Sequence, residues 1–324
     1  MKAKILVTGG FVSDHYLHEL HLKGFEVKNI TADLDEKELI EEIKDVNAYI
    51  LGGVERVTSK VINAAKSLKI ISFIGVGYQN FIPASKEAQN KGILITNTPG
   101  ANTETAAEMT WSLLFALQRR VPYLNGNTKR GEWGTYKSHE LKGATLGIVG
   151  MGSIGTTVAR QAYYGFNMKV IYHSRSAKPD IEKELGATKT SLKELLKSAD
   201  VISLHCSLNS ETRGLIGEKE LALLKQNALL INMAPSDVID PKALYECLSN
   251  RRITGAAMDG YYIEPAPTPD KDPYKLLSLP DDIFVITPHI GGQTFEASNR
   301  MSEMAIESVL CALKGGSVPR VVIS

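Results

Sequence analysis

The sequence predicts an α/β protein with parallel sheets, arranged in about two domains. Short apolar runs alternate with helical segments of about ten residues, which is the pattern of βαβ units. In the middle of the chain an apolar run, 146–149, leads into the glycine-rich stretch 150–155, and a helical pattern and a second apolar run, 169–172, follow. The length of 324 residues is large for one domain.

The first hundred residues carry one complete α/β layer unit. We expect strands at 3–8, 25–30, 48–51, 70–74 and 93–96, and helices at 14–23, 35–44, 59–68 and 85–90. The segment 35–44 shows the reason for a helix, because its charges fall on one face and Leu39, Ile40 and Ile43 on the other.

A second α/β unit follows a long helical stretch. The stretch 104–120 predicts an interdomain helix, and the polar segment 123–143 predicts an excursion or arm. Beyond it we expect strands at 201–204, 228–232, 255–258 and 284–287, and helices at 192–198, 218–224, 241–248 and 296–313. The C-terminal tail, 318–324, can pack on either domain. If the last helix returns to the first unit, the domains are 1–102 with 293–324, and 103–292.

Composition excludes several classes of protein. Apolar residues make up 43% and charged residues 23% of the chain, and the net charge is +1, so no nucleic acid or membrane partner is expected. Cys206, Cys247 and Cys311 show no paired spacing and predict reduced thiols without a metal site. The N-terminus lacks a signal-peptide pattern and no apolar run reaches the length of a membrane span, so we expect a cytoplasmic protein.

The glycine-rich stretch predicts a dinucleotide site. Gly150 permits a tight turn, Gly152 lets the backbone approach a pyrophosphate, and Gly155 lets the helix pack on the strand. The helix begins at about Ser153 and Ile154, where unpaired N–H groups attract phosphate oxygens.

Seven pieces of the chain resemble the D-isomer-specific 2-hydroxyacid dehydrogenases. They are IGVGYQN at 74–80, AAEMTWSLLFALQRRVP at 106–122, LGIVGMGSIG at 146–155, ADVISLHCSLNSETRGLIG at 199–217, ALLINMAPSDVID at 228–240, AAMDGYYIEP at 256–265 and TPHIGGQT at 287–294. The resemblance implies two Rossmann-like domains with the active site in the cleft between them, and a homodimer joined through the cofactor domains. Residues 1–102 and 293–324 would form a flavodoxin-like substrate domain, and 103–292 an NAD(P)-binding Rossmann domain.

The resemblance also implies an oxidoreductase that transfers hydride between NAD(P)H and a small carbonyl or hydroxy compound. Reduction of a carbonyl requires an acid for its oxygen, and His289, directly after a strand, is the candidate. Glu264 is its expected partner, since a carboxylate orients the imidazole and favours its charged form. The alternative is that His289 lies on the surface and Glu264 in a solvated loop.

NADP is the expected cofactor, with NAD as the other candidate. An NAD-specific site places a carboxylate at the end of the second strand, where this chain has His173, Ser174 and Arg175. Arg175 can pair with a 2′-phosphate, or it can be a solvated arginine in an enzyme that uses both cofactors. Further cofactor contacts are expected from residues of the matched motifs: His205, Cys206, Thr212, Met233, Ala234, Asp259, His289 and Gly291. His205 can equally be a structural residue at a strand end.

Candidate substrate contacts lie in the first unit. The loop Gly75-Val76-Gly77 matches a family loop whose backbone N–H groups hold a carboxylate, although a simple turn would use the same residues. Arg56 can supply a cation, or it can be a solvated loop residue.

One position departs from the family pattern. The family arginine of the N-x-A-R-G pattern is replaced by Pro235, followed by Ser236 and Asp237. Proline cannot pair with a carboxylate, so the sequence predicts an altered substrate. The alternative is a catalytically degenerate dinucleotide-binding sensor or interaction protein.

Overall fold

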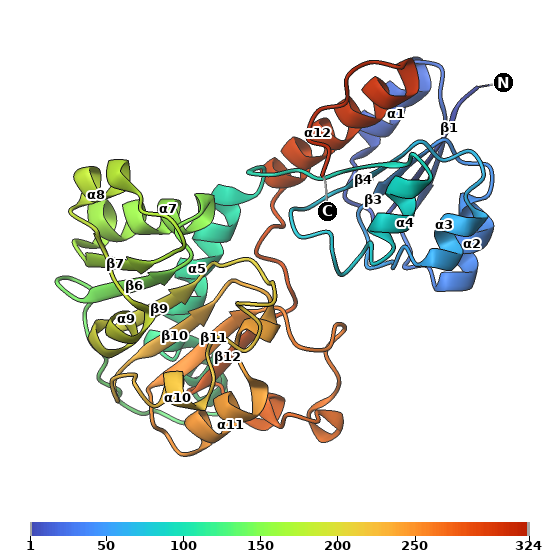
Figure 1. The fold of residues 1–324 in the computed structure, drawn as a ribbon. Coiled ribbons are helices and arrows are strands. Elements are labelled where there is room, and N and C mark those ends of the chain that lie inside the picture. The colour runs from blue at the N-terminus through green and yellow to red at the C-terminus, as the bar shows by residue number, and fades with distance from the viewer. Residues whose placement is uncertain (1, 323–324) are drawn as a thin grey trace. The chain divides into compact units, whose positions relative to one another are not determined.

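The computed structural model describes residues 2–322. They form two compact units, one of residues 2–102 with 292–322 and the other of residues 103–291. We call them unit 1 and unit 2 (Figure 1). The second segment of unit 1 starts one residue earlier than the sequence suggested.

Unit 1 is a doubly wound parallel sheet with the strand order β2-β1-β3-β4-β5. The strands are β1 (Lys4–Thr8), β2 (Glu26–Ile30), β3 (Ala48–Leu51), β4 (Ile70–Phe73) and β5 (Leu94–Thr96), and the helices are α1 (Asp14–Leu22), α2 (Glu36–Ile43), α3 (Ser59–Ala64), α4 (Ser85–Asn90) and α12 (Phe295–Lys314). Successive residues of a strand enter different cores: Leu6 joins the one with α2 and α3, and Ile5 and Val7 join the one with α1 and α12. The tail belongs to this unit, because Val321 bridges Thr96 and the Val322 N–H donates to Ile95 O at 2.8 Å.

Unit 2 is a parallel sheet with the strand order β12-β11-β10-β9-β6-β7-β8. The strands are β6 (Thr145–Val149), β7 (Lys169–His173), β8 (Thr188–Lys189), β9 (Val201–Leu204), β10 (Leu229–Asn232), β11 (Gly255–Asp259) and β12 (Phe284–Thr287). The helices are α5 (Thr103–Gln118), α6 (Val121–Lys129), α7 (Ser153–Arg160), α8 (Pro179–Leu185), α9 (Leu192–Ser198), α10 (Glu218–Leu221) and α11 (Pro241–Ser249). Residues of α5 and α7 share one core with Leu229 and Ile231, and residues of α9 and α11 share another with Leu230, so helices cover both faces of the sheet.

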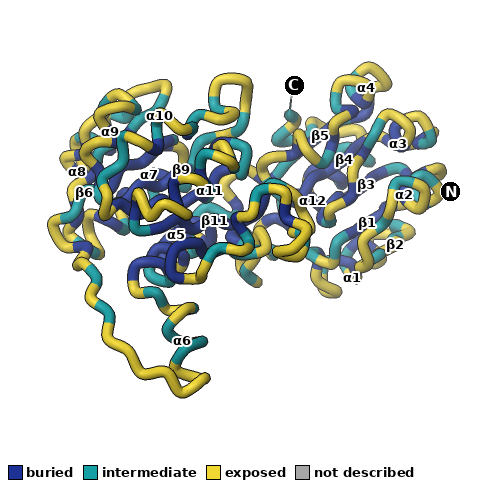
Figure 2. Tube along the Cα trace, turned by 90° about the horizontal axis from the view of Figure 1, so that it is seen from below, coloured by how far each residue is buried: buried dark blue, intermediate teal, exposed yellow. Residues whose placement is uncertain are grey.

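The arm, residues 121–143, differs from the polar excursion that the sequence indicated. It begins as helix α6, which has no buried residue, and continues as an exposed segment (Figure 2). The last part of the arm, residues 136–142, which we call its return, is anchored on the end of α5. There Gln118 Nε2 donates to His139 O at 2.7 Å, and the Arg120 guanidinium lies 3.8 Å from the centre of the Tyr136 ring.

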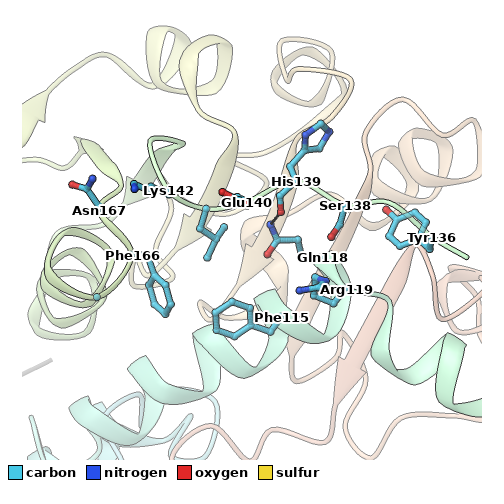
Figure 3. Close-up of a pocket in the computed structure, with 12 residues that line it drawn as sticks. Phe115, Gln118, Arg119, Tyr136, Ser138, His139, Glu140, Lys142, Phe166 and Asn167 are labelled. Carbon is cyan, nitrogen blue, oxygen red and sulfur yellow. Dashed lines mark hydrogen bonds between the residues drawn. The ribbon is translucent and has the colours of Figure 1, made fainter.

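A cavity of about 620 Å³ lies beneath this return, between α5 and residues 136–142 (Figure 3). Its lining includes Phe166 and Asn167, which lie three and two residues before the start of β7, so the cavity lies at the amino edge of the sheet. Ligands of open α/β sheets bind at the carboxyl edge, where the residues described next are found. Among residues 2–322 no helix is long and apolar enough to cross a membrane.

Candidate active site

The glycine-rich loop after β6 has a conformation that requires its glycines. Gly150 has a φ of 99°, and a Cβ there would lie 2.6 Å from the backbone N of Cys206. A Cβ on Gly155 would lie 2.3 Å from Gly150 O, so helix α7 can approach the loop only without a side chain at this position. A Cβ on Gly152, in contrast, would meet open space. This combination fits a nicotinamide dinucleotide whose pyrophosphate lies against Gly152 and the N–H groups of Ser153 and Ile154.

The end of β7 lies beside this loop, since Gly150 N–H donates to His173 O at 2.8 Å. The His173 ring is bonded to Thr190 O through Nδ1, and the Ser174 hydroxyl donates to Ser176 O at 2.6 Å. Ser174 therefore has a partner within its own turn, whereas Arg175 is exposed. The sequence analysis missed Lys189 at the end of the neighbouring strand β8, whose ammonium donates to Arg175 O at 3.3 Å. Arg175 and Lys189 thus lie close together near the end of β7.

The segment after β9 is held mainly by local hydrogen bonds. His205 Nε2 and Ser203 Oγ are 2.7 Å apart, and burial lowers the pKa of His205 to about 3, so the ring is neutral. Its Nδ1 atom is buried and has no partner among the described residues. The Thr212 hydroxyl donates to Ser207 O, and Cys206 contributes backbone against Gly150. Thr212 thus helps to form the turn, and its expected cofactor contact stays a prediction.

Asp259, at the end of β11, has a structural role that the sequence analysis did not foresee. Its Oδ1 accepts hydrogen bonds from Thr287 Oγ1 at 2.7 Å and Ile290 N–H at 2.9 Å, and its Oδ2 accepts one from Gly291 N–H at 2.6 Å. A Cβ on Gly291 would lie 2.5 Å from Oδ2. The carboxylate therefore holds the loop 287–291 in place, and its oxygens are already engaged.

His289 is the central residue of that loop. Its φ is 55°, which is left-handed backbone, and its N–H donates to Thr287 O at 2.9 Å. Its Nδ1 lies 3.1 Å from both carboxylate oxygens of Glu264, and Glu264 Oε1 also accepts the Tyr261 N–H at 3.0 Å. The structure therefore brings together the two residues that the sequence suggested as a pair.

The pair is electrostatically biased toward the charged state. The hydrogen bond that His289 donates to Glu264 raises the pKa of His289 against the opposing effect of burial, and the charges of Glu264 and Asp259 raise it further. Burial tends to raise the pKa of Glu264, but the hydrogen bond and charge of His289 outweigh it and lower that pKa overall. About 59% of the His289 side chain remains exposed. An imidazolium that is oriented and accessible can give a proton to a carbonyl oxygen.

Pro235 follows β10 and starts the turn 236–238 with a φ of −52°. Asp237, two residues later, forms an ion pair with Arg213. It is therefore a paired carboxylate, which the sequence alone did not show. Met233 and Ala234 lie between β10 and this turn; the Met233 Cε is 2.8 Å from where a Cβ on Gly291 would be, and Ala234 N–H donates to Asn232 Oδ1 at 3.0 Å. Arg213 is thus the ion-pair partner of Asp237.

In unit 1 the loop Gly75-Val76-Gly77 follows β4 and is clamped by two residues that the sequence analysis missed. Thr98 Oγ1 contacts both the N–H and the C=O of Gly75, and Asn97 Nδ2 donates to Val76 O at 2.8 Å. Within residues 2–322 the N–H groups of Val76 and Gly77 donate to no other group, and a Cβ on Gly77 would meet open space. The only hint in the sequence was the position of Asn97 and Thr98 directly after β5, at the carboxyl edge.

Comparisons with known proteins decide the family. Residues 111–291 match the family described as D-isomer specific 2-hydroxyacid dehydrogenase, NAD binding domain. The chain belongs to the D-isomer-specific 2-hydroxyacid dehydrogenases. The glyoxylate reductase of Thermococcus litoralis is 38% identical over 293 residues, which are 88% of this chain and 86% of that protein.

Solved structures agree with the 2-hydroxyacid dehydrogenase fold. The crystal structure of the TT0316 protein from Thermus thermophilus has a TM-score of 0.88 and 36% identity, and the match covers 99% of this chain and 100% of that chain. An acyclic imino acid reductase in complex with NADPH and D-Arg has a TM-score of 0.84 and 26% identity, over 99% and 100% of the two chains. The chain is therefore an NAD(P)-dependent oxidoreductase of a small hydroxy or carbonyl compound, and the alternative of a degenerate sensor is not favoured.

Proposed function

We propose that this 2-hydroxyacid dehydrogenase is an NADPH-dependent reductase of a small carbonyl compound that is larger or less acidic than glyoxylate or pyruvate. The observation that carries the proposal is the intact pair His289–Glu264 together with Pro235 at the position of the family arginine. The acid is present, but the guanidinium that would hold a carboxylate beside the reacting carbonyl is not.

We assign the residues the following roles. His289 is the proton donor to the carbonyl oxygen, and Glu264 orients it and maintains its charge. The free N–H groups of Val76 and Gly77, with Arg56, hold the polar end of the substrate. The cofactor, when bound, supplies the hydride; Gly150, Gly152, Ser153, Ile154 and Gly155 hold its pyrophosphate, and residues 173–175 its ribose.

A preference for NADPH is part of this proposal. Arg175 and Lys189 at the ends of β7 and β8 can pair with a 2′-phosphate, and no acidic residue stands at 173–175 to repel it. The imino acid reductase of similar fold is bound to NADPH, which agrees with this choice.

We also propose a homodimer in which the arm packs against a second copy. Helix α6 buries none of its residues, and the arm exposes Trp133 by 90% and Val121 by 54%. An isolated helix of nine residues has only marginal stability in water, so a second copy that covers these side chains would stabilise it.

We propose a cytoplasmic location, which agrees with the three free cysteines.

The test compares pyruvate with ethyl pyruvate, which differ only in the charge and size of the carboxyl group. With NADPH we expect kcat/KM for ethyl pyruvate to exceed that for pyruvate, glyoxylate and hydroxypyruvate. If glyoxylate or pyruvate instead reached about 10⁴ M⁻¹s⁻¹ or more, the altered substrate would be refuted, and another cation would have to replace the arginine.

The imino acid reductase suggests a second candidate function, the reduction of a C=N bond. The absence of the arginine favours it, since a protonated imine is itself cationic and a neighbouring guanidinium would repel it. Adding ammonium to the pyruvate assay tests this candidate: NADPH oxidation that rises with ammonium, with alanine as the product, would support it.

A further inference from the structure

Glu55 is a buried carboxylate in unit 1 to which the proposed reaction assigns no role. Only 2% of it is exposed, although it lies in the irregular loop 52–57 between β3 and α3. Its Oε2 accepts a hydrogen bond from Thr8 Oγ1 at 3.1 Å, and that hydroxyl lies 3.0 Å from the hydroxyl of Tyr49. A buried carboxylate costs free energy unless its partners compensate, so its place in a surface loop calls for a reason.

The carboxylate occupies a special point of the sheet. In the order β2-β1-β3-β4-β5 the strand β2 is added on one side of β1, whereas β3, β4 and β5 follow on the other side. The strand order thus reverses between β1 and β3, and open α/β sheets bind ligands at such a switch point. The loop after β1 and the loop after β3 are in contact here, because a Cβ on Gly9 would lie 2.2 Å from Gly53 N. The Glu55 carboxylate lies under this contact, since a Cβ on Gly53 would be 2.3 Å from its Oε2. Glu55 thus fills the switch point from inside and ties the loop after β3 to β1.

The loop is anchored a second time at its other end. Val57 is fully buried, its N–H donates to Phe81 O at 2.7 Å, and its C=O accepts the Ala84 N–H. Arg56 lies between the buried residues Glu55 and Val57, so its side chain points toward solvent. Both Arg56 and Val54 are exposed. The loop therefore presents one cation and one apolar side chain at the carboxyl edge, next to the loop that follows β4.

We propose that Glu55 is a positioning residue for substrate recognition: its hydrogen bond to Thr8 holds loop 52–57 in the conformation that presents Val54 and Arg56 to the substrate. This inference rests on the proposed role of Arg56. The hydrogen bond and the shape of the side chain, more than the charge, carry the effect, because the carboxylate contacts Thr8 and the Gly53 backbone and pairs with no cation within residues 2–322.

A first experiment measures the loop without any substrate. Limited trypsin digestion, followed by mass spectrometry, reports cleavage after Arg56. We expect Glu55→Ala and Thr8→Val to accelerate this cleavage at least about fivefold, while Glu55→Gln, which keeps an oxygen acceptor, and Glu26→Ala, at an exposed position of β2, match the wild type. Unchanged cleavage in both Glu55→Ala and Thr8→Val would overturn the proposal, as would Glu55→Gln behaving like Glu55→Ala.

A second experiment measures recognition, using pyruvate or ethyl pyruvate, whichever gives the larger kcat/KM. Glu55→Ala should raise KM for that compound about tenfold, as expected for a displaced hydrogen-bonding group, with kcat within about twofold and unchanged NADPH affinity. The double variant Glu55→Ala/Arg56→Ala should be no worse than Arg56→Ala alone, because Glu55 acts through Arg56. Equal losses in kcat and NADPH affinity would indicate general destabilisation and overturn the proposal. If the wild type turned over neither compound, the proposed function would fail, and trypsin cleavage would still decide the role of Glu55.

Discussion

At the residue scale, His289 is controlled by two carboxylates with different tasks. Glu264 bonds to the ring and raises its pKa. Asp259 accepts hydrogen bonds from the Thr287 hydroxyl before His289 and from the N–H groups of Ile290 and Gly291 after it, and so fixes the position of the loop that carries the ring. The sequence indicated the first partner through its motif. For Asp259 the sequence predicted a cofactor contact, which stays a prediction. Only the folded chain shows that the 287–291 loop uses both of its carboxylate oxygens.

The pH dependence of carbonyl reduction follows from the raised pKa of His289. The acid form is present below that pKa, so kcat/KM for the carbonyl should fall as the pH rises through it. Glu264→Gln removes the charge that raises the pKa, so this fall should move to lower pH, toward about 6.5. A pH profile of Glu264→Gln that is unmoved or shifted to higher pH would contradict the pairing.

His289→Ala should lower the rate of carbonyl reduction about 10²–10⁴-fold and leave the cofactor affinity intact.

Cofactor preference is also decided by single side chains. Arg175→Ala should weaken NADPH by about fivefold in Kd, about 1 kcal/mol for an exposed ion pair, and leave NADH unchanged. Fluorescence titration of both cofactors measures this, with Arg119→Ala, an exposed arginine at the opposite edge of the sheet, as the matched control. Equal NADPH binding in Arg175→Ala would remove the support for a 2′-phosphate contact.

At the scale of elements, the glycines of the cofactor loop serve different purposes. The loop and helix α7 pack so closely that Gly150 and Gly155 are needed for the fold, whereas the space around Gly152 is open. The motif predicted the tight turn at Gly150 and the close packing at Gly155, because both leave a local signature in the sequence. The approach of the pyrophosphate to Gly152 stays a prediction.

This difference can be separated experimentally. Gly155→Ala should lower the free energy of unfolding by about 1–3 kcal/mol, since its Cβ would overlap with Gly150 O. Gly152→Ala should leave stability within about 0.5 kcal/mol but weaken NADPH binding, because the new methyl group occupies the space for the pyrophosphate. Thermal unfolding and cofactor titration of the two variants provide the test, and the reverse pattern would contradict the assignment.

At the scale of the whole molecule, the arm is the part of unit 2 that does not complete its own packing. Its two ends are anchored on α5, but α6 and the segment after it keep Val121, Tyr123 and Trp133 exposed. Large exposed apolar groups of this kind mark protein interfaces.

We therefore expect a dimer in sedimentation or light scattering. Trp133→Ala combined with Val121→Ala should shift the protein toward the monomer at micromolar concentration, with the fold of each unit unchanged. Leu22→Ala, at a residue of unit 1 that is 75% exposed, is the control and should not change the mass. A monomeric wild type, or an unchanged dimer in the double variant, would refute the role of the arm.

The sequence alone predicted the α/β class, the cofactor loop and the pair His289–Glu264, because each depends on local periodicity or on a motif of neighbouring residues. The departure from the family pattern at Pro235 stays a prediction. Only the tertiary structure decided that Asp259 supports the catalytic loop, that Thr98 and Asn97 clamp Gly75 and Val76, and that Asp237 is neutralised by Arg213. It also decided that Glu55 is buried against Thr8. The physical reason is that each of these contacts joins side chains or backbone groups more than twenty residues apart, which meet only when parallel strands bring their carboxyl ends to one edge.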